Sequence, residues 1–147
     1  MSRALAVLLA TGAGCFVGLQ APVNARLSRQ IGSLQAASVS FLVGTLALLV
    51  VASLSSGGLA GIGNAGRAPW WALIGGLLGA FYVTVALLTV RTLGLSGLTA
   101  IVVAGQLAVA VAVDRFGLLG IPKQHIDASR VVGLVLLLVG VVLVVRR

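Results

Sequence analysis

Five long apolar runs occupy most of this 147-residue chain. A helix that crosses the hydrocarbon core of a bilayer, about 30 Å thick, needs about 20 mainly apolar residues. The runs that reach or approach this length are residues 4–27, 34–54, 70–90, 95–113 and 131–145. Backbone inside hydrocarbon must satisfy its own hydrogen bonds, and these runs lack the polar–apolar alternation of β-barrel strands. We therefore predict an all-α integral membrane protein, a single domain over residues 1–147 with five transmembrane helices.

The composition leaves no room for a soluble domain, since 60% of the residues are hydrophobic, 8% are charged and the mean hydropathy is +1.21. The net charge of +8 comes from ten Lys and Arg residues that lie almost entirely between the apolar runs. Cations in such positions anchor helices at anionic headgroups. We expect the bilayer as a partner and no nucleic acid, because no basic cluster is interleaved with aromatic residues.

The N-terminus offers two interpretations. Residues 3–10 resemble the start of a signal peptide, but the apolar run continues through Leu19, which favours a retained first helix. The lone cysteine, Cys15, can form no internal disulfide and has no histidine nearby, so we expect no enzyme. His125 has only Asp127 beside it, so we expect no metal or cofactor.

Lys and Arg are balanced between the two membrane faces if five helices span. One face carries Arg3, Arg67, Arg115, Lys123 and Arg130, and the other carries Arg26, Arg29, Arg91, Arg146 and Arg147. An excess of Lys and Arg on one side normally fixes the orientation of a membrane protein, so this balance does not strongly favour either orientation. Either the balance arises by chance or the chain inserts both ways and pairs with its inverted copy.

An odd number of spans favours insertion in both orientations and pairing with an inverted copy. Two tandem copies of such a unit would lie upside down relative to each other, which is the plan of many secondary transporters. An antiparallel homodimer of ten helices would reproduce this inverted arrangement from one gene. Gly133 and Gly140 stand seven residues apart in an otherwise Leu- and Val-rich run, so we predict that they form the dimer interface.

Polar side chains inside a span are costly and usually mark function. Gln20 and Asn24 lie on one helical face, and Pro22 between them frees a backbone carbonyl, which suits a kinked helix beside a cavity. We predict a substrate site from Gln20, Asn24, Tyr82 and Gln106, with Pro22 as the hinge. The structural alternative is that Gln20 and Asn24 satisfy each other and the kink.

No Asp or Glu lies inside a span except Asp114, at the end of the fourth run. A proton-driven exporter of cations would need a buried carboxylate that exchanges protons for substrate. We therefore expect a neutral or zwitterionic substrate, facilitated movement, or an ion bound by carboxamides and carbonyls.

Several spaced motifs resemble the YdcZ-type small transporters, a five-span branch of the drug/metabolite transporter superfamily. They are "GLQAPVNARLSRQIGS", "SVSFLVGTLAL", "PWWALIGGLLGAFYVTVALLTVRTLG", "VVAGQLAVAVAVDRFGLLG" and "GLVLLLVGVVLVV". The last also resembles the dimerising helix of small multidrug resistance proteins. This chain lacks the acidic residue of their first helix, where Gln20 is the nearest polar residue, so cation/proton antiport is in doubt.

The resemblance implies a bacterial inner-membrane transporter that works as a paired or duplicated unit. The positions that match the family pattern are Gln20, Pro22, Asn24, Ser40, Phe41, Gly44, Trp70, Gly79, Tyr82, Gly105, Gln106, Asp114 and Gly140. We expect transport of a small polar metabolite or drug-like compound by alternating access. The alternatives are a passive channel, a non-transporting accessory subunit, or a heterodimer with a paralogous subunit.

Overall fold

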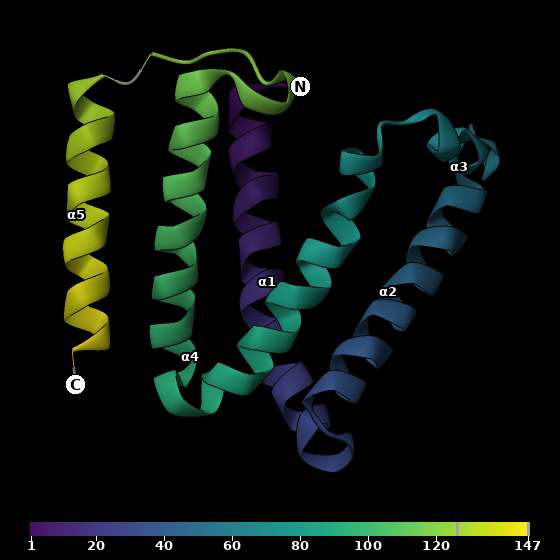
Figure 1. Ribbon diagram of the computed structural model, residues 1–147, viewed down its shortest axis with the longest axis horizontal. Coiled ribbons are helices and arrows are strands. Elements are labelled where there is room, and N and C mark those ends of the chain that lie inside the picture. Colours follow the sequence, from purple (N-terminus) through teal and green to yellow (C-terminus); the bar gives the residue numbers. More distant parts are fainter. Residues whose placement is uncertain (126, 147) are drawn as a thin grey trace. The chain divides into compact units, whose positions relative to one another are not determined.

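The computed structural model describes residues 1–125 and 127–146, and this part of the chain is helical without strands (Figure 1). The long helices are α1 (Arg3–Ile31), α2 (Ser33–Leu54), α4 (Gly75–Phe116) and α5 (Ala128–Val145). Short helical turns occupy the connectors: α3 (Ala60–Gly63), η1 (Asn64–Arg67), η2 (Trp70–Ile74) and η3 (Leu118–Gly120). The chain divides into two compact units, Met1–Leu88 and Thr89–Arg147, which are described separately below.

Four helical stretches in the described chain are long and apolar enough to cross a membrane, and the third, Trp70–Phe116, has 47 residues. A straight helix of that length would extend about 70 Å, more than twice the hydrocarbon core. The backbone of α4 leaves the helical region at Gly94, with φ 68° and ψ 166°, a conformation that essentially only glycine adopts. The break separates 75–93 from 95–116 and supports the five-span count, which stays a prediction.

Helix α1 begins where the hydroxyl of Ser2 accepts a hydrogen bond of 3.2 Å from the backbone N–H of Leu5. It ends at Gly32, whose φ of 92° suits glycine. Pro22 lies inside α1, which remains a single helix across it. The proline cannot donate to the carbonyl four residues earlier, but this missing hydrogen bond does not break α1.

The core of the first unit joins α1, α2 and the first part of α4. Ala36 and Ala37 on α2 are buried together with Val83 and Leu87 on α4, and Tyr82 packs against this cluster. Helices gain no hydrophobic drive from meeting each other in lipid, so small residues that allow close approach favour their packing. Ala36 and Ala37 are small enough to allow this close packing, and it lies directly beside Tyr82, one of the predicted polar residues.

Phe41 and Gly79 make a second close contact between α2 and α4. A Cβ atom placed on Gly79 would lie 3.2 Å from the Cζ of Phe41, tighter than most real Cβ contacts. Because the side chain of Gly79 is a single hydrogen atom, the ring of Phe41 fits against this helix. Both residues belong to the family pattern in the sequence, which does not reveal that they meet.

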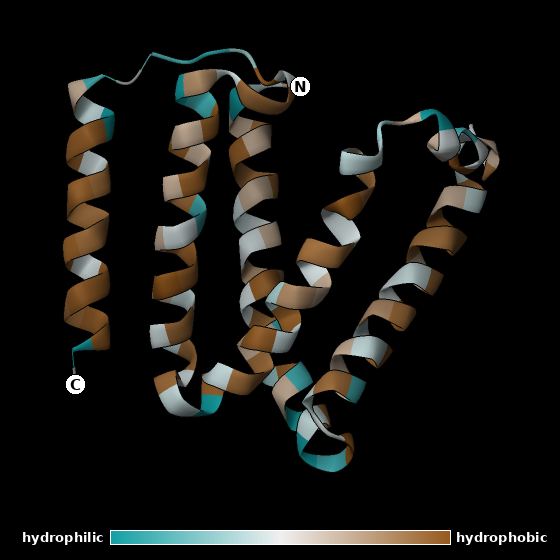
Figure 2. Cartoon of the chain, in the orientation of Figure 1, coloured by the Kyte–Doolittle hydropathy of each residue, from teal (hydrophilic) through white to brown (hydrophobic). Residues whose placement is uncertain are grey.

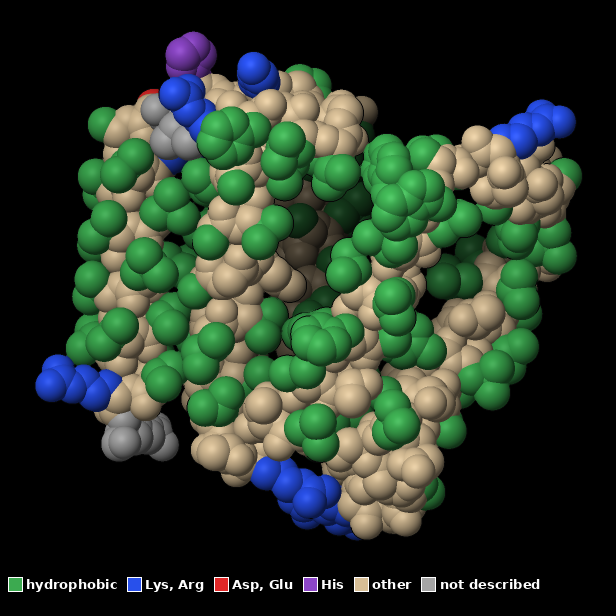
Figure 3. All heavy atoms as spheres, in the orientation of Figure 1, with side chains coloured by type: hydrophobic (Ala, Val, Ile, Leu, Met, Phe, Trp, Pro, Cys, Tyr) green, Lys and Arg blue, Asp and Glu red, His purple; other side chains and the backbone are tan. Residues whose placement is uncertain are grey.

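Apolar side chains cover the flanks of the long helices, whereas Lys and Arg gather at helix ends and connectors (Figures 2 and 3). Leu8, Leu48, Leu77 and Val132 are among the large hydrophobic residues that lie more than half exposed. A soluble domain rarely exposes so much contiguous apolar surface. Lipid contact explains this distribution.

The connector at residues 55–68 contains the short turns α3 and η1. Helical structure resumes at Trp70, after Pro69, as the 3₁₀ segment η2. The α-helix itself begins only at Gly75.

In the second unit, residues 95–116 and α5 are joined by polar contacts near the connector. The Nη1 atom of Arg130, in the first turn of α5, lies 3.2 Å from Oδ2 of Asp114. The backbone N–H of Gln124 donates to the carbonyl oxygen of Asp114 over 2.9 Å. The connector therefore folds back onto the end of α4.

Candidate substrate site

A hydrogen bond between two polar side chains joins α1 to α2 in the first unit. The Nδ2 atom of Asn24 donates to the hydroxyl oxygen of Ser40 over 3.1 Å. Asn24 is only 7% exposed, so its amide depends on a partner within the protein. The bond also orients Asn24, because its NH₂ group points to Ser40.

Gln20, Asn24 and Tyr82, three of the four residues predicted to bind substrate, line one small pocket. Its remaining walls are the apolar residues Val17, Ala21, Val83, Ala86 and Leu87. The cavity volume is about 10 Å³. This is about the space required by one water molecule, so the described conformation is closed to a larger solute.

Gln20 also lines a second, larger cavity. This cavity measures about 210 Å³, and its other lining residues are Ser40, Phe41, Gly44, Thr45 and Leu48. The side chain of Gln20 is thus shared by the two spaces. Asn24 lines the smaller space, and its partner Ser40 lines the larger one.

The polar groups around both cavities are uncharged: two carboxamides, two hydroxyl groups and one phenol. Such groups recognise ligands by donating and accepting hydrogen bonds. Among residues 1–125 and 127–146, no group of three or more His, Cys, Asp or Glu side chains is placed to hold a metal ion. The chemistry of the lining fits a neutral or zwitterionic solute better than an unpaired ion.

The fourth predicted site residue, Gln106, has an exposed side chain and lies in the unit Thr89–Arg147. The structure thus brings together three of the four predicted substrate residues in one unit. The predicted hinge, Pro22, is exposed on α1 between Gln20 and Asn24. Its role in motion stays a prediction.

The two glycines predicted for the dimer interface lie on α5 in different surroundings. Gly133 lines a cavity with residues from the end of α4, and Gly140 is partly buried. A Cβ atom on either glycine would meet nothing within 4 Å. Neither glycine is therefore used for close packing within the described chain.

Sequence reasoning gave too little weight to three residues of the site. Ser40 and Thr45 are polar residues within the second apolar run that were not placed in the predicted site, and Phe41 was indicated only by the family resemblance. The distance of 16 residues between Asn24 and Ser40 carries no periodic signal. A small polar residue opposite a buried carboxamide is the one signal that could have singled out Ser40.

Comparison with known proteins agrees with these features. Residues 5–143 match the model of a family described as "Putative inner membrane exporter, YdcZ". The chain belongs to this family. It is 33% identical over 148 residues to the inner membrane protein YdcZ of Escherichia coli (strain K12), covering 99% of this chain and 97% of that protein.

The family assignment confirms the resemblance seen in the sequence. The chain is an inner-membrane protein of a transporter family, and this family is described as exporters rather than enzymes. No solved structure matches the chain closely enough for comparison.

Proposed function

We propose that this protein moves a small neutral or zwitterionic metabolite, or a drug-like compound of similar polarity, across the inner membrane by alternating access. The observation that carries the proposal is the Asn24–Ser40 hydrogen bond, whose two residues line two cavities that share Gln20. Polar groups inside a span are retained at a cost, and here they converge at one place. The family description suggests export as the direction.

In this proposal Gln20, Asn24 and Tyr82 bind the substrate, and Gln106 completes the polar surface in the assembled transporter. The cavity of about 10 Å³ at Tyr82 is too small for a metabolite. In the proposed transport cycle, this conformation is therefore one in which the substrate site is closed. Movement of α1 around Pro22 would open it, because the missing hydrogen bond at a proline lowers the cost of bending.

We further propose that the working unit is an antiparallel homodimer of ten spans. The equal numbers of cationic anchors and the break at Gly94, which supports an odd number of spans, favour it. The proposed contact lies on α5, at Gly133 and Gly140. A heterodimer with a paralogous subunit would use the same helix.

Flux through liposomes that contain only this chain tests the proposal. A thermal-shift screen of neutral and zwitterionic metabolites supplies the candidate substrates, and uptake of labelled hits is then measured. Saturable flux supports the transporter. Conductance without saturation identifies a channel, and no flux of any hit identifies an accessory subunit.

Labelling of single cysteines near Arg3 and near Arg146 in intact cells tests the inverted dimer. Both positions should be labelled from both sides of the membrane in comparable amounts. A population that faces one way only would contradict dual insertion but leave the transport proposal standing.

A further inference from the structure

A groove in the second unit runs between residues 95–116 and α5, and each helix contributes one stripe to it. The stripe on α4 has the spacing i, i+3, i+4 and i+7 of a single helical face, and the stripe on α5 has the spacing i, i+3 and i+4. Each stripe carries one charged residue at the end near the connector. The lining residues are Leu107, Ala110, Val111 and Asp114 on α4, and Arg130, Gly133 and Leu134 on α5.

The groove measures about 390 Å³ and is not filled by side chains of this unit. A Cβ atom on Gly133 would meet nothing within 4 Å. Between two membrane helices such a space does not stay empty, because its walls would lose the dispersion contacts that packed atoms provide. An apolar chain from outside this unit must occupy it.

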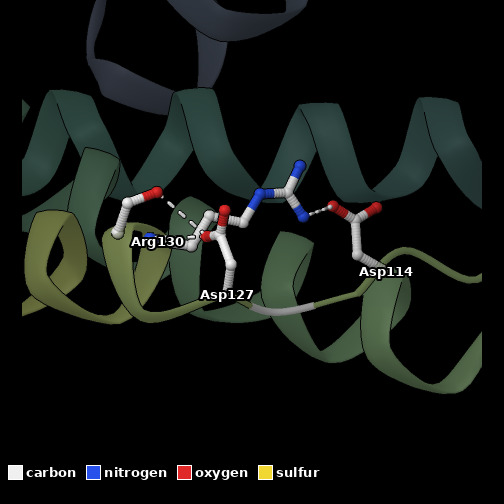
Figure 4. Close-up of polar contacts among 4 residues, drawn as sticks. Asp114, Asp127 and Arg130 are labelled. Atoms are coloured by element: carbon white, nitrogen blue, oxygen red, sulfur yellow. Dashed lines mark hydrogen bonds and ion pairs between the residues drawn. The ribbon is translucent and has the colours of Figure 1, made fainter.

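The polar end of the groove limits the choice of occupant. Arg130 and Asp114 form an ion pair there with an N–O distance of 3.2 Å, and their side chains are 43% and 28% exposed (Figure 4). This contact uses one of the five N–H donors of the guanidinium and one acceptor site of the carboxylate. A cation and an anion that can each bind more groups therefore stand side by side at the entrance.

We propose that this groove binds a phospholipid with a zwitterionic headgroup that carries a primary ammonium, such as phosphatidylethanolamine. The phosphate binds the guanidinium of Arg130, and the ammonium donates to the carboxylate of Asp114. One acyl chain lies along the apolar part of the two stripes. From Asp114 to Leu107 this part covers about 10 Å at 1.5 Å per residue, and the chain continues deeper between the helices.

The pairing of opposite charges distinguishes this lipid from other occupants. An anionic headgroup without an ammonium would meet the carboxylate of Asp114 unpaired, and a trimethylated ammonium has no N–H to donate. An apolar helix of a second copy would offer no group to the remaining donors of Arg130 and the remaining acceptor sites of Asp114. With lipid beside Gly133, the proposed dimer contact is left to the later part of α5, at Gly140.

Native mass spectrometry of the purified full chain tests the proposal and needs no transport substrate. The probes are phosphatidylethanolamine, phosphatidylcholine and phosphatidylglycerol with identical acyl chains. A charge-assisted hydrogen bond discriminates by about tenfold or more. We therefore expect phosphatidylethanolamine to be retained about tenfold more strongly than phosphatidylcholine. Equal retention of the two lipids would overturn the proposal.

Two variants and a matched control locate the site. Asp114→Asn should abolish the preference for ethanolamine over choline, whereas Ala110→Trp fills the groove and should reduce retention of every lipid. Asp127→Asn is the control, because Asp127 contacts the backbone of the same arginine but does not line the groove, and its preference should match the original chain. Unchanged lipid selectivity in Asp114→Asn would overturn the assignment.

The alternative occupant is tested by cross-linking through Gly133→Cys in membranes rich in phosphatidylethanolamine. Efficient disulfide formation between two copies would mean that a second protomer covers the groove and would overturn the lipid proposal. If Asp114→Asn does not fold, the comparison of ethanolamine and choline lipids on the original chain still decides the question. Failure here leaves the transport proposal untouched, because neither Asp114 nor Arg130 belongs to the substrate site.

Discussion

Asn24 on α1 donates a hydrogen bond to Ser40 on α2, and the two residues line cavities of very different size. It joins two helices in the part of the protein where the polar side chains of the first unit converge. The bond therefore contributes to both packing and recognition. Variants of Ser40 can separate the two contributions.

Replacing Ser40 with alanine leaves the buried amide of Asn24 without this acceptor. Hydrogen bonds between membrane helices contribute about 0.6–1.7 kcal/mol, and we expect a loss of stability of that size. Unfolding of the purified chain in mixed micelles measures it. Ser40→Thr keeps the hydroxyl and serves as the control, so equal stability of both variants would show that the bond is dispensable.

Replacing Gln20 or Gln106 with leucine should abolish transport without lowering expression, because leucine removes the donor and acceptor groups proposed to bind the substrate. The measurement is flux of a screened hit in liposomes. Gln30→Leu, at the exposed end of α1 and away from both cavities, is the matched control and should transport normally. Normal flux in both test variants would remove the proposed site.

Replacing Gly79 with alanine should push the ring of Phe41, because the new methyl group would stand 3.2 Å from its Cζ atom. Overpacking costs about 1–3 kcal/mol, and we expect the lower part of that range because the ring is partly exposed. Phe41→Leu in the same chain should recover most of the loss. A double-mutant cycle without coupling between the two positions would contradict the contact.

Replacing Gly94 with alanine should destabilise the break in α4, since an L-residue at φ 68° and ψ 166° costs about 1–3 kcal/mol. Thermal unfolding measures the effect. Gly97→Ala is the control, because its Cβ would lie at an ordinary 3.6 Å from Leu93 and its backbone is helical. If both variants unfold at the same temperature, the glycine at 94 is not required for the break.

Asp127 caps α5, and the backbone N–H of Arg130 and the hydroxyl of Ser129 donate to its carboxylate and lower its pKa. A lowered pKa means that the folded state favours the ionised form. The cap therefore contributes fully above the unfolded pKa of about 4 and is lost as the pH falls through the lower folded value. Hydrogen exchange at the Arg130 amide should accelerate over that range relative to neighbouring amides, and Asp127→Ala should remove this pH dependence.

The helical membrane fold could be predicted because long apolar runs in lipid admit few structures. The boundary between the third and fourth runs was expected between residues 90 and 95, and the break at Gly94 lies there. A proline is a weaker signal of a helix boundary. Helix α1 continues through Pro22, because a helix in lipid can tolerate one missing backbone hydrogen bond.

The site could be predicted only as far as single helices allow. The spacing of Gln20 and Asn24 places them on one face of α1, and the structure places both at the same pocket. The partners Ser40 and Phe41 depend on how α1, α2 and α4 cross, which periodicity along one helix does not contain. The same limit applies to Gln106, whose role depends on the assembly.

The dihedral angles of one glycine have a topological consequence. If Gly94 separates two spans, the chain crosses the membrane an odd number of times and its two ends emerge in different compartments. A straight helix at this point would make the number even and return both ends to the same side. Gene fusion of two copies would then need an extra connecting span to invert the second, so the parity set at residue 94 determines which evolutionary routes are open to this protein.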